Sequence, residues 1–390
     1  MKKRVKHFAS MALCGLALMV TAGFASDASS QTQYPNYSRL SAPDLQRLAD
    51  QGDMHALFTQ GYNLIFDETM RLRVNPEFAK AKALLERAHQ GGHENANSIL
   101  MLYYQGEFGG QPDPAKLENL LLTSAQRGSA VAQLNYASNF IYSDVAPQSD
   151  KALQFLTRAS TDPTVAENAL PMLIEVLYGV DSDKHRNLPL ARQKAQDCVR
   201  RFAQNTFCHF ILGQDFGNGW AGTVDKTKSD FHFLKAAEAG DARAQWQIGM
   251  YHLNGERVPK DERTAYNWVK KSADQGYVDG LISFAVMNAI GQGTALNKTA
   301  AFQAYEKAAS LGSAHALRAL GAMYCSGEAP KTDRDLCAAA LILAYEMEDD
   351  LSANLLTRFF NVQDQTGFDA LKNKTATARA KLSKRYDIPL

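Results

Sequence analysis

The sequence has few of the features that would place the protein in a membrane or on nucleic acid. Beyond residue 25 no run of 18 apolar residues occurs, so we expect no stable membrane insertion of the mature chain. Lysine and arginine together number 42, which barely exceeds the 41 acidic residues. Nucleic-acid binding needs a clustered basic face, so this charge balance predicts no nucleic-acid partner.

Recognisable catalytic motifs are also absent. The sequence contains no Gly-x-Ser-x-Gly elbow, no His-Glu-x-x-His helix and no Gly-x-x-x-x-Gly-Lys phosphate-binding loop. His89 and His93 are four residues apart, which would suit a metal on one helix, but Gly91 and Gly92 between them should end that helix. We therefore expect a protein that is not an enzyme and has no catalytic residues, no cofactor and no bound metal.

The first 25 residues have the layout of a secretory signal peptide. A basic start precedes the apolar run Met11–Val20, which is too short to span a bilayer, and small residues at Gly23 and Ala25 suit cleavage after Ala25. Four basic residues and no acidic ones lie in this segment, so the mature chain keeps 38 basic and 41 acidic residues. This pattern predicts a periplasmic or secreted protein, and the alternative is an uncleaved N-terminal anchor.

A period of 36 residues is the strongest pattern in the sequence. Small residues such as Ala237, Ala273 and Ala309 recur at this spacing, and two columns of glycine do the same. Several independent columns that share one period indicate a repeat architecture. The two glycine columns are Gly240, Gly276 and Gly312, and Gly255, Gly291 and Gly327.

One period is predicted to form two helices joined by a turn. Residues 244–253 place small or apolar side chains on one helical face, and Gly255 ends that helix because glycine adopts a left-handed backbone without strain. Pro259 cannot continue the helix and marks the crossover to a second helix, residues 262–275, which Gly276 closes. A lone hairpin cannot bury its apolar face, so neighbouring hairpins must stack to form the core.

The residues of this period resemble the Sel1-like repeat, a relative of the tetratricopeptide repeat. The resemblance rests on Ala244, Gly249, Gly255, Ala265 and Ala273 with their neighbours. It is clearest over residues 230–350, extends to 44–140 and is weak over 145–229, where Pro163 and Pro171 replace the closing glycine region. The resemblance implies an all-α fold, a right-handed superhelical solenoid of about eight or nine helical hairpins.

Four segments follow from this division of the chain. Residues 1–25 are the signal peptide, and the polar stretch 26–43 with its prolines is predicted to be a flexible linker. Residues 44–360 form the repeat array. Residues 361–390 form a capping helix and tail, in which the polar helical pattern 370–384 is expected to keep a solvated outer face.

Four cysteines remain after cleavage, and an exported chain favours their oxidation. Cys198 and Cys208 lie on either side of a short turn between helices, and Cys325 and Cys337 flank a loop in the same way. Residues placed symmetrically about an antiparallel turn can come within the Cα separation of a disulfide. The alternative is four small buried thiols at alanine-like positions, because Cys208 and Cys337 occupy the columns of Ala244 and Ala265.

Trp220 is the candidate residue for partner binding. It stands between glycines in the loop 217–229, which is longer than the neighbouring turns, and insertions on a solenoid often fall on its binding face. An exposed tryptophan would be a suitable anchor for a protein partner. The alternative is that the ring packs onto its own hairpin.

The resemblance implies a periplasmic module that binds a protein partner on a concave surface and acts as an envelope adaptor. An alternative is an immunity-type inhibitor, because exported proteins of this family include partners of secreted antibacterial phospholipase toxins. A third is the weak penicillin binding or hydrolysis of some cysteine-rich members. The sequence has no Ser-x-x-Lys arrangement and lacks their cysteine pair in nearly every repeat, which counts against that activity.

Overall fold

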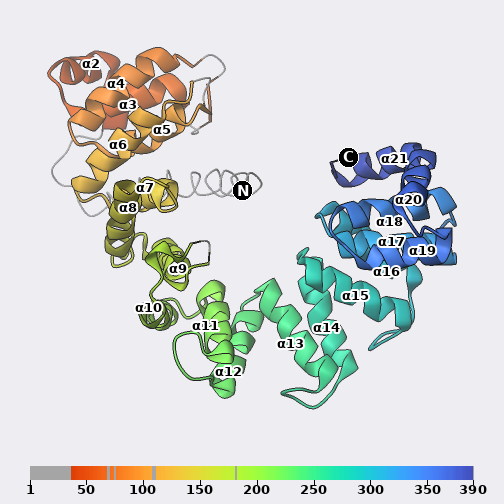
Figure 1. The fold of residues 1–390 in the computed structure, drawn as a ribbon. Coiled ribbons are helices and arrows are strands. Elements are labelled where there is room, and N and C mark those ends of the chain that lie inside the picture. Colours follow the sequence, from red (N-terminus) through yellow and green to blue (C-terminus); the bar gives the residue numbers. More distant parts are fainter. Residues whose placement is uncertain (1–36, 68–70, 74–75, 108–110, 181, 390) are drawn as a thin grey trace. The chain divides into compact units, whose positions relative to one another are not determined.

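The protein is helical throughout the part that the computed structural model describes, which is residues 37–67, 71–73, 76–107, 111–180 and 182–389 (Figure 1). Within these residues the only β-type pairing is an isolated bridge between Phe66 and Leu72. The all-α prediction is therefore confirmed. The predicted signal peptide lies outside the described residues. After Leu173 the chain divides into two compact units.

Among its described residues, the first unit contains seven α-helices and the beginning of an eighth. Its hairpins are α3 with α4, α5 with α6, and α7 with α8, and neighbouring hairpins pack through α4 with α5 and α6 with α7. The helices are α2 (Ala42–Asp50), α3 (Met54–Ile65), α4 (Phe78–Gln90), α5 (Glu94–Tyr104), α6 (Pro114–Gln126), α7 (Ala130–Phe140), α8 (Ala146–Ala159) and α9 (Ala166–Tyr178).

The boundary predicted between the linker and the array is wrong by several residues. Helix α2 begins at Ala42, and Ser41 caps it by accepting a hydrogen bond from the Asp44 N–H. A short 3₁₀ turn precedes it, where the Tyr37 hydroxyl donates to the Asp53 carboxylate at 2.9 Å. The polar composition of residues 37–43 therefore reflects capping and turn formation, and not a linker. Residues 26–36 lie outside the described part.

The second unit continues the same alternation of helices. First helices α11, α13, α15 and α17 each pack against the second helix that follows, and α13 also contacts α15 directly. With α9 and α10 as consecutive helices before them, the described chain has eight successive helix pairs from α3 to α18. The helices are α10 (Leu188–Arg201), α11 (Thr206–Asn218), α12 (Lys226–Glu238), α13 (Ala242–Asn254), α14 (Glu262–Asp274), α15 (Val278–Ile290), α16 (Lys298–Ser310), α17 (Ala314–Ser326) and α18 (Arg334–Glu346).

A repeating cap determines where the second helices begin. The Asp261 carboxylate accepts hydrogen bonds from the backbone N–H groups of Arg263 and Thr264, each at 3.0 Å. These donors have no partner inside the helix, so the side chain satisfies them. The same position recurs at the 36-residue period as Asp225, Asn297 and Asp333.

Glycine ends the first helices as the sequence predicts. Gly255, Gly291 and Gly327 are the C-caps of α13, α15 and α17, with φ of +71°, +73° and +77°. Inside α13, Gly249 has a different role, because a Cβ there would lie 2.7 Å from Cγ2 of Val269. The absence of a side chain at Gly249 lets α13 and α14 pack closely. The second glycine column, Gly240, Gly276 and Gly312, also takes positive φ after the second helices.

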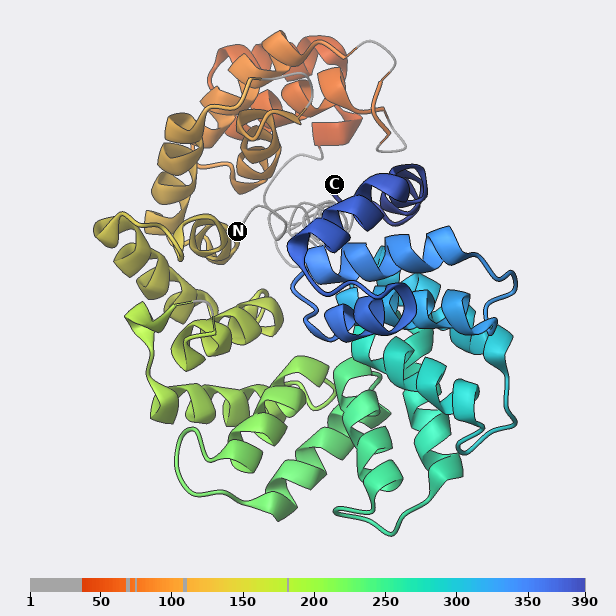
Figure 2. The same ribbon diagram turned by 45° about the vertical axis from the view of Figure 1, so that its right-hand side comes forward.

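The C-terminal cap differs from its prediction. Instead of one polar helix over 370–384, the structure has α20 (Gln365–Lys374) and α21 (Ala376–Tyr386) after α19 (Leu351–Phe360). Helix α21 packs on α18 and contacts α16, with Leu382 and Tyr386 buried (Figures 1 and 2). Because α18 has neighbours on both sides, every residue from Cys337 to Ala344 is buried, and a helix that is apolar all round needs such cover.

Candidate partner-binding surface

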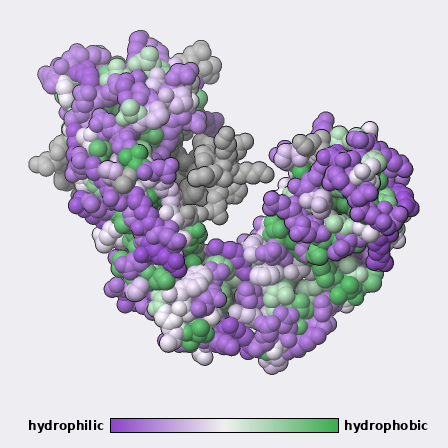
Figure 3. Space-filling view, in the orientation of Figure 1, coloured by the Kyte–Doolittle hydropathy of each residue, from purple (hydrophilic) through white to green (hydrophobic). Residues whose placement is uncertain are grey.

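Four apolar side chains on α13 and α15, the first helices of two consecutive repeats in the second unit, are not fully buried. Trp246 and Met250 lie one turn apart on α13, and Val286 and Ile290 lie one turn apart on α15. We call these four residues the first-helix face. Ile290 is 64% exposed and Val286 is 38% exposed, while Trp246 and Met250 are half-buried. Figure 3 shows hydrophobic surface in the region of α15.

Trp246 is held in place by the next repeat. Its indole Nε1 donates a hydrogen bond to the Ser283 hydroxyl on α15 at 3.0 Å. The edge of its ring meets Tyr277, with 6.0 Å between the ring centroids. Burial, followed by the Asp279 carboxylate, raises the pKa of Tyr277 to about 12, so that this side chain carries no charge near neutral pH. The first-helix face therefore has an aromatic residue that the next repeat holds in place.

Trp220 does not belong to this face. It follows Gly219, the left-handed C-cap of α11, and its ring meets Tyr178 edge to face at 5.6 Å between centroids. Trp220 keeps 38% of its surface exposed. Trp220 therefore packs on α9 and not on its own hairpin, and its role in partner binding stays a prediction.

A buried ion pair supports the loop that carries Trp220. Asp215 is fully buried, receives a hydrogen bond from Arg192 Nε, and accepts another from the backbone N–H of Ala221 at 2.9 Å. The Arg192 guanidinium lies 4.6 Å above the Phe216 ring. Asp215 occupies the column of Tyr251, Met287 and Met323. A charge at a position that is buried in the other repeats is a signal that sequence analysis could have used.

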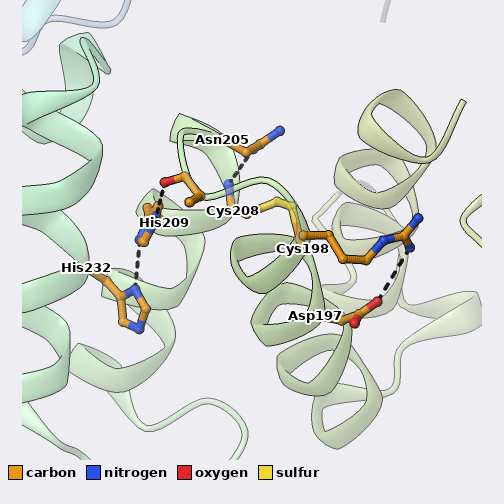
Figure 4. The surroundings of a disulfide bond; sticks show 8 residues. Asp197, Cys198, Asn205, Cys208, His209 and His232 are labelled. Carbon is orange, nitrogen blue, oxygen red and sulfur yellow. Dashed lines mark hydrogen bonds and ion pairs between the residues drawn. A yellow bond between two sulfur atoms is a disulfide. The ribbon is translucent and has the colours of Figure 1, made fainter. Parts of the chain in front are cut away.

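Two histidines meet beside this region, between α11 and α12 (Figure 4). The Nδ1 atoms of His209 and His232 are 3.0 Å apart, and His209 Nε2 bonds the carbonyl of Ala203 at 3.2 Å. Burial, then the neighbouring His209 and Lys228, lower the pKa of His232 to about 4. Burial also lowers the pKa of His209. Both rings are therefore neutral near pH 7, and one N–H donates to the other ring.

Both predicted disulfides are present in the structure. Cys198 on α10 bonds Cys208 on α11, with a Cα separation of 6.2 Å, and so joins consecutive hairpins (Figure 4). Cys325 on α17 bonds Cys337 on α18, with a Cα separation of 5.4 Å, and so joins the two helices of one hairpin. The alternative of free thiols does not apply to this structure.

Metal-binding clusters and membrane-spanning helices do not occur among the described residues. No group of three or more histidine, cysteine, aspartate or glutamate side chains in that part could hold a metal ion. His93 instead stacks on Phe58, with 4.1 Å between centroids, and meets His55 at 4.9 Å. No described helix is long and apolar enough to cross a bilayer.

The helical hairpins of the structure coincide with stretches that match a family model. A family model described as Sel1 repeat matches five stretches of the chain, each falling on helices of the arrays above. The chain is a Sel1 repeat protein. The matched residues are 130–162, 207–241, 242–277, 285–313 and 314–346.

The chain is also similar to solved structures and to a curated protein. A protective antigen of uropathogenic Escherichia coli that displays an SLR fold is 19% identical, with a TM-score of 0.55, over 88% of this chain and 85% of that one. A Sel1 repeat protein from Oxalobacter formigenes is 24% identical over 72% of this chain and 89% of that one, with a TM-score of 0.47. Chitin synthase regulatory factor 3 of Schizosaccharomyces pombe is 25% identical over 248 residues. That match covers 60% of this chain and 26% of the relative, so the chain spans about a quarter of that protein's length.

Sel1 repeats typically mediate protein–protein interactions, and scaffolds built from them are generally not enzymes. This chain is built from such repeats. They supply a stacked surface on which exposed side chains of the helices are available for contact. The first-helix face meets this description, and periodicity alone did not identify it because its residues differ in type from repeat to repeat.

Proposed function

We propose that this Sel1 repeat protein is an exported adaptor that binds a protein partner through the first-helix face. The observation that supports the proposal is the exposure of Val286 and Ile290 on α15, the helix whose Ser283 holds the ring of Trp246. Large apolar side chains grouped on a surface mark interaction sites more often than scattered ones do. The basic and apolar start of the sequence supports export to the periplasm.

The expected energetic contribution of this face is moderate. Covering the exposed parts of Val286 and Ile290 would stabilise a complex by about 2 kcal/mol, on the area scale for apolar burial. That energy corresponds to about a thirtyfold change in the dissociation constant. A partner suited to this face presents apolar side chains without a buried unpaired charge, because the four residues offer no charge to compensate one.

A pull-down with matched variants tests the surface. The mature chain, the double variant Val286→Asp/Ile290→Asp and the control Phe231→Asp/Leu234→Asp are incubated with periplasmic extract of the bacterium that encodes the protein. The control pair is also exposed, at 54% and 39%, but lies on the second helix α12. We expect a protein that the wild type and the control retain and the first-helix variant loses.

Three outcomes would contradict the proposal. A partner that the control loses and the first-helix variant keeps would move the binding surface to the second helices. Protein recovered from the cytoplasmic fraction with residues 1–25 intact would remove the periplasmic assignment, and N-terminal sequencing measures this. If the partner is an enzyme whose activity falls on binding, the chain acts as an inhibitor and not as an adaptor.

A further inference from the structure

A hollow of about 390 Å³ lies at the C-terminal end of the second unit, where α18 begins and α19 and α20 end. Figure 2 shows these helices side by side in blue. Three basic side chains, Arg334, Arg358 and Lys374, line it together with the single acidic residue Asp335. Apolar residues complete the lining, among them Phe360 and Leu371.

The three cations have no acidic partner within the described part of the chain. Arg334 donates one hydrogen bond from Nη2 to the carbonyl of Phe359 at 3.0 Å, and its guanidinium lies 5.2 Å from the Phe360 ring centroid. Arg358 contacts the Phe359 ring at 5.5 Å. These contacts orient the guanidinium groups but leave most of their donors unused, since each guanidinium carries five N–H groups.

The charge of the lining matches a doubly charged anion. Three cations and one carboxylate give a net charge of +2, and a phosphate monoester carries about −1.5 to −2 at pH 7. A carboxylate would neutralise only half of that charge. Phosphate also has three free oxygens, which accept from three cations at once, and the planar arginine fork binds such oxygens in pairs.

The apolar lining adds to this selectivity, whereas the first turn of the 13-residue helix α18 does not. The Asp333 carboxylate already accepts hydrogen bonds from the N–H groups of Asp335 and Leu336, so the three basic side chains alone supply the contacts to the phosphate. Phe360 and Leu371 offer an apolar wall for the organic part of a ligand. A hollow of this volume lies within the usual range of small-molecule sites.

We propose that this hollow binds a small organic phosphate monoester, with Arg334, Arg358 and Lys374 holding the phosphate and Phe360 and Leu371 contacting the organic group. The site is separate from the first-helix face and does not depend on the proposed partner binding. It adds a small-molecule site to the terminal cap of the scaffold.

Calorimetric titration of the mature full-length chain with phenyl phosphate, inorganic phosphate and benzoate tests the proposal. Phenyl phosphate should bind about tenfold more tightly than either of the others, because it alone offers both the dianion and the apolar group. Arg358→Gln and Lys374→Gln should each weaken phenyl phosphate about tenfold, since each removes a charge-assisted contact. Both side chains are exposed, so the fold should persist, and circular dichroism checks this. The control Lys381→Gln changes an exposed lysine outside the hollow and should bind like the wild type.

The other results would overturn the assignment. Equal affinity for inorganic and phenyl phosphate would indicate an adventitious ion only. Benzoate binding as tightly as phenyl phosphate would make the site a carboxylate site. Sedimentation with phosphatidic acid vesicles in the absence of phenyl phosphate binding would indicate a membrane surface. Unchanged affinity in both glutamine variants would place the ligand elsewhere.

Discussion

Replacing Asp215 by methionine should destabilise the region around α10, α11 and α12 even though methionine occupies the same column elsewhere. Met287 and Met323 stand two and three periods further along, and both are buried. Residue 215 differs from these positions because the Arg192 guanidinium lies next to it. The substitution removes the acceptor of Arg192 Nε and of the Ala221 N–H.

The size of the effect follows from the burial of the two partners. Breaking a buried ion pair by removing one member costs about 3–5 kcal/mol, because a charge is left without compensation. The Arg192 side chain keeps 18% exposure and can turn toward water, so we expect the lower limit, about 3 kcal/mol. Replacing Arg192 by methionine as well removes that charge. The double variant then lacks mainly the acceptor of Ala221, which costs about 1 kcal/mol.

Native-state hydrogen exchange is the appropriate assay, because repeat arrays open in segments and a single melting temperature averages over them. The opening free energy of amides in α11 and α12 should fall by about 3 kcal/mol in Asp215→Met and by about 1 kcal/mol in the double variant. Amides in α15 and α16 serve as the internal control and should not change. Equal losses in the single and double variants would refute the ion-pair argument.

Three further predictions concern pH, oxidation and backbone conformation. His232 has a pKa of about 4 in the fold against about 6.5 in an unfolded chain, so the folded state binds fewer protons and stability falls as the pH drops from about 6.5 toward 4. After a discount for partial solvent access, the free energy of unfolding of the wild type should fall by about 1 kcal/mol more than that of His232→Gln between pH 7 and pH 5, as measured by urea titrations. The same fall in both proteins would contradict this prediction. Reduction of both disulfides should lower the free energy of unfolding by about 3 kcal/mol for each short loop, measured as a shift of the denaturation midpoint. An unchanged midpoint would show that the disulfides do not constrain the two loops. Gly255→Val should cost about 1–3 kcal/mol because its φ is +71°, whereas the exposed control Asn267→Ala should leave the melting temperature unchanged, and equal melting temperatures would refute the role of Gly255.

The repeat architecture could be predicted because local residues decide it. A glycine at Gly255 or Gly291 ends a helix through its own backbone freedom, and Pro259 marks a crossover through its own ring. Such signals act over a few residues and recur at one period, so the hairpins and their order follow from the chain itself. The cysteine pairs belong to the same class, because each pair lies around one short turn.

The candidate sites depend on distances that no periodic pattern contains. Arg192 and Asp215 are 23 residues apart, on helices of different hairpins, and the sequence does not state which lysine or arginine will reach a buried carboxylate. The first-helix face could be identified only from the exposure of each side chain. An apolar residue of a first helix can lie in the core at one position and on the surface at the next. The hollow of the terminal cap requires the ends of three helices to converge.

The sequence alone determined the helical class, the 36-residue period and the helix-ending glycines, because each depends on neighbouring residues along the chain. It left the two disulfide loops as one of two alternatives, between which the structure decides. Only the tertiary structure decided that residues 370–384 divide into two helices, that α21 covers α18, and that His209 and His232 meet at 3.0 Å. These features depend on how helices that are distant in the sequence pack against one another. The polar pattern of α21 records its solvated side, whereas the two side chains that anchor it, Leu382 and Tyr386, acquire their role only when α18 offers an uncovered face.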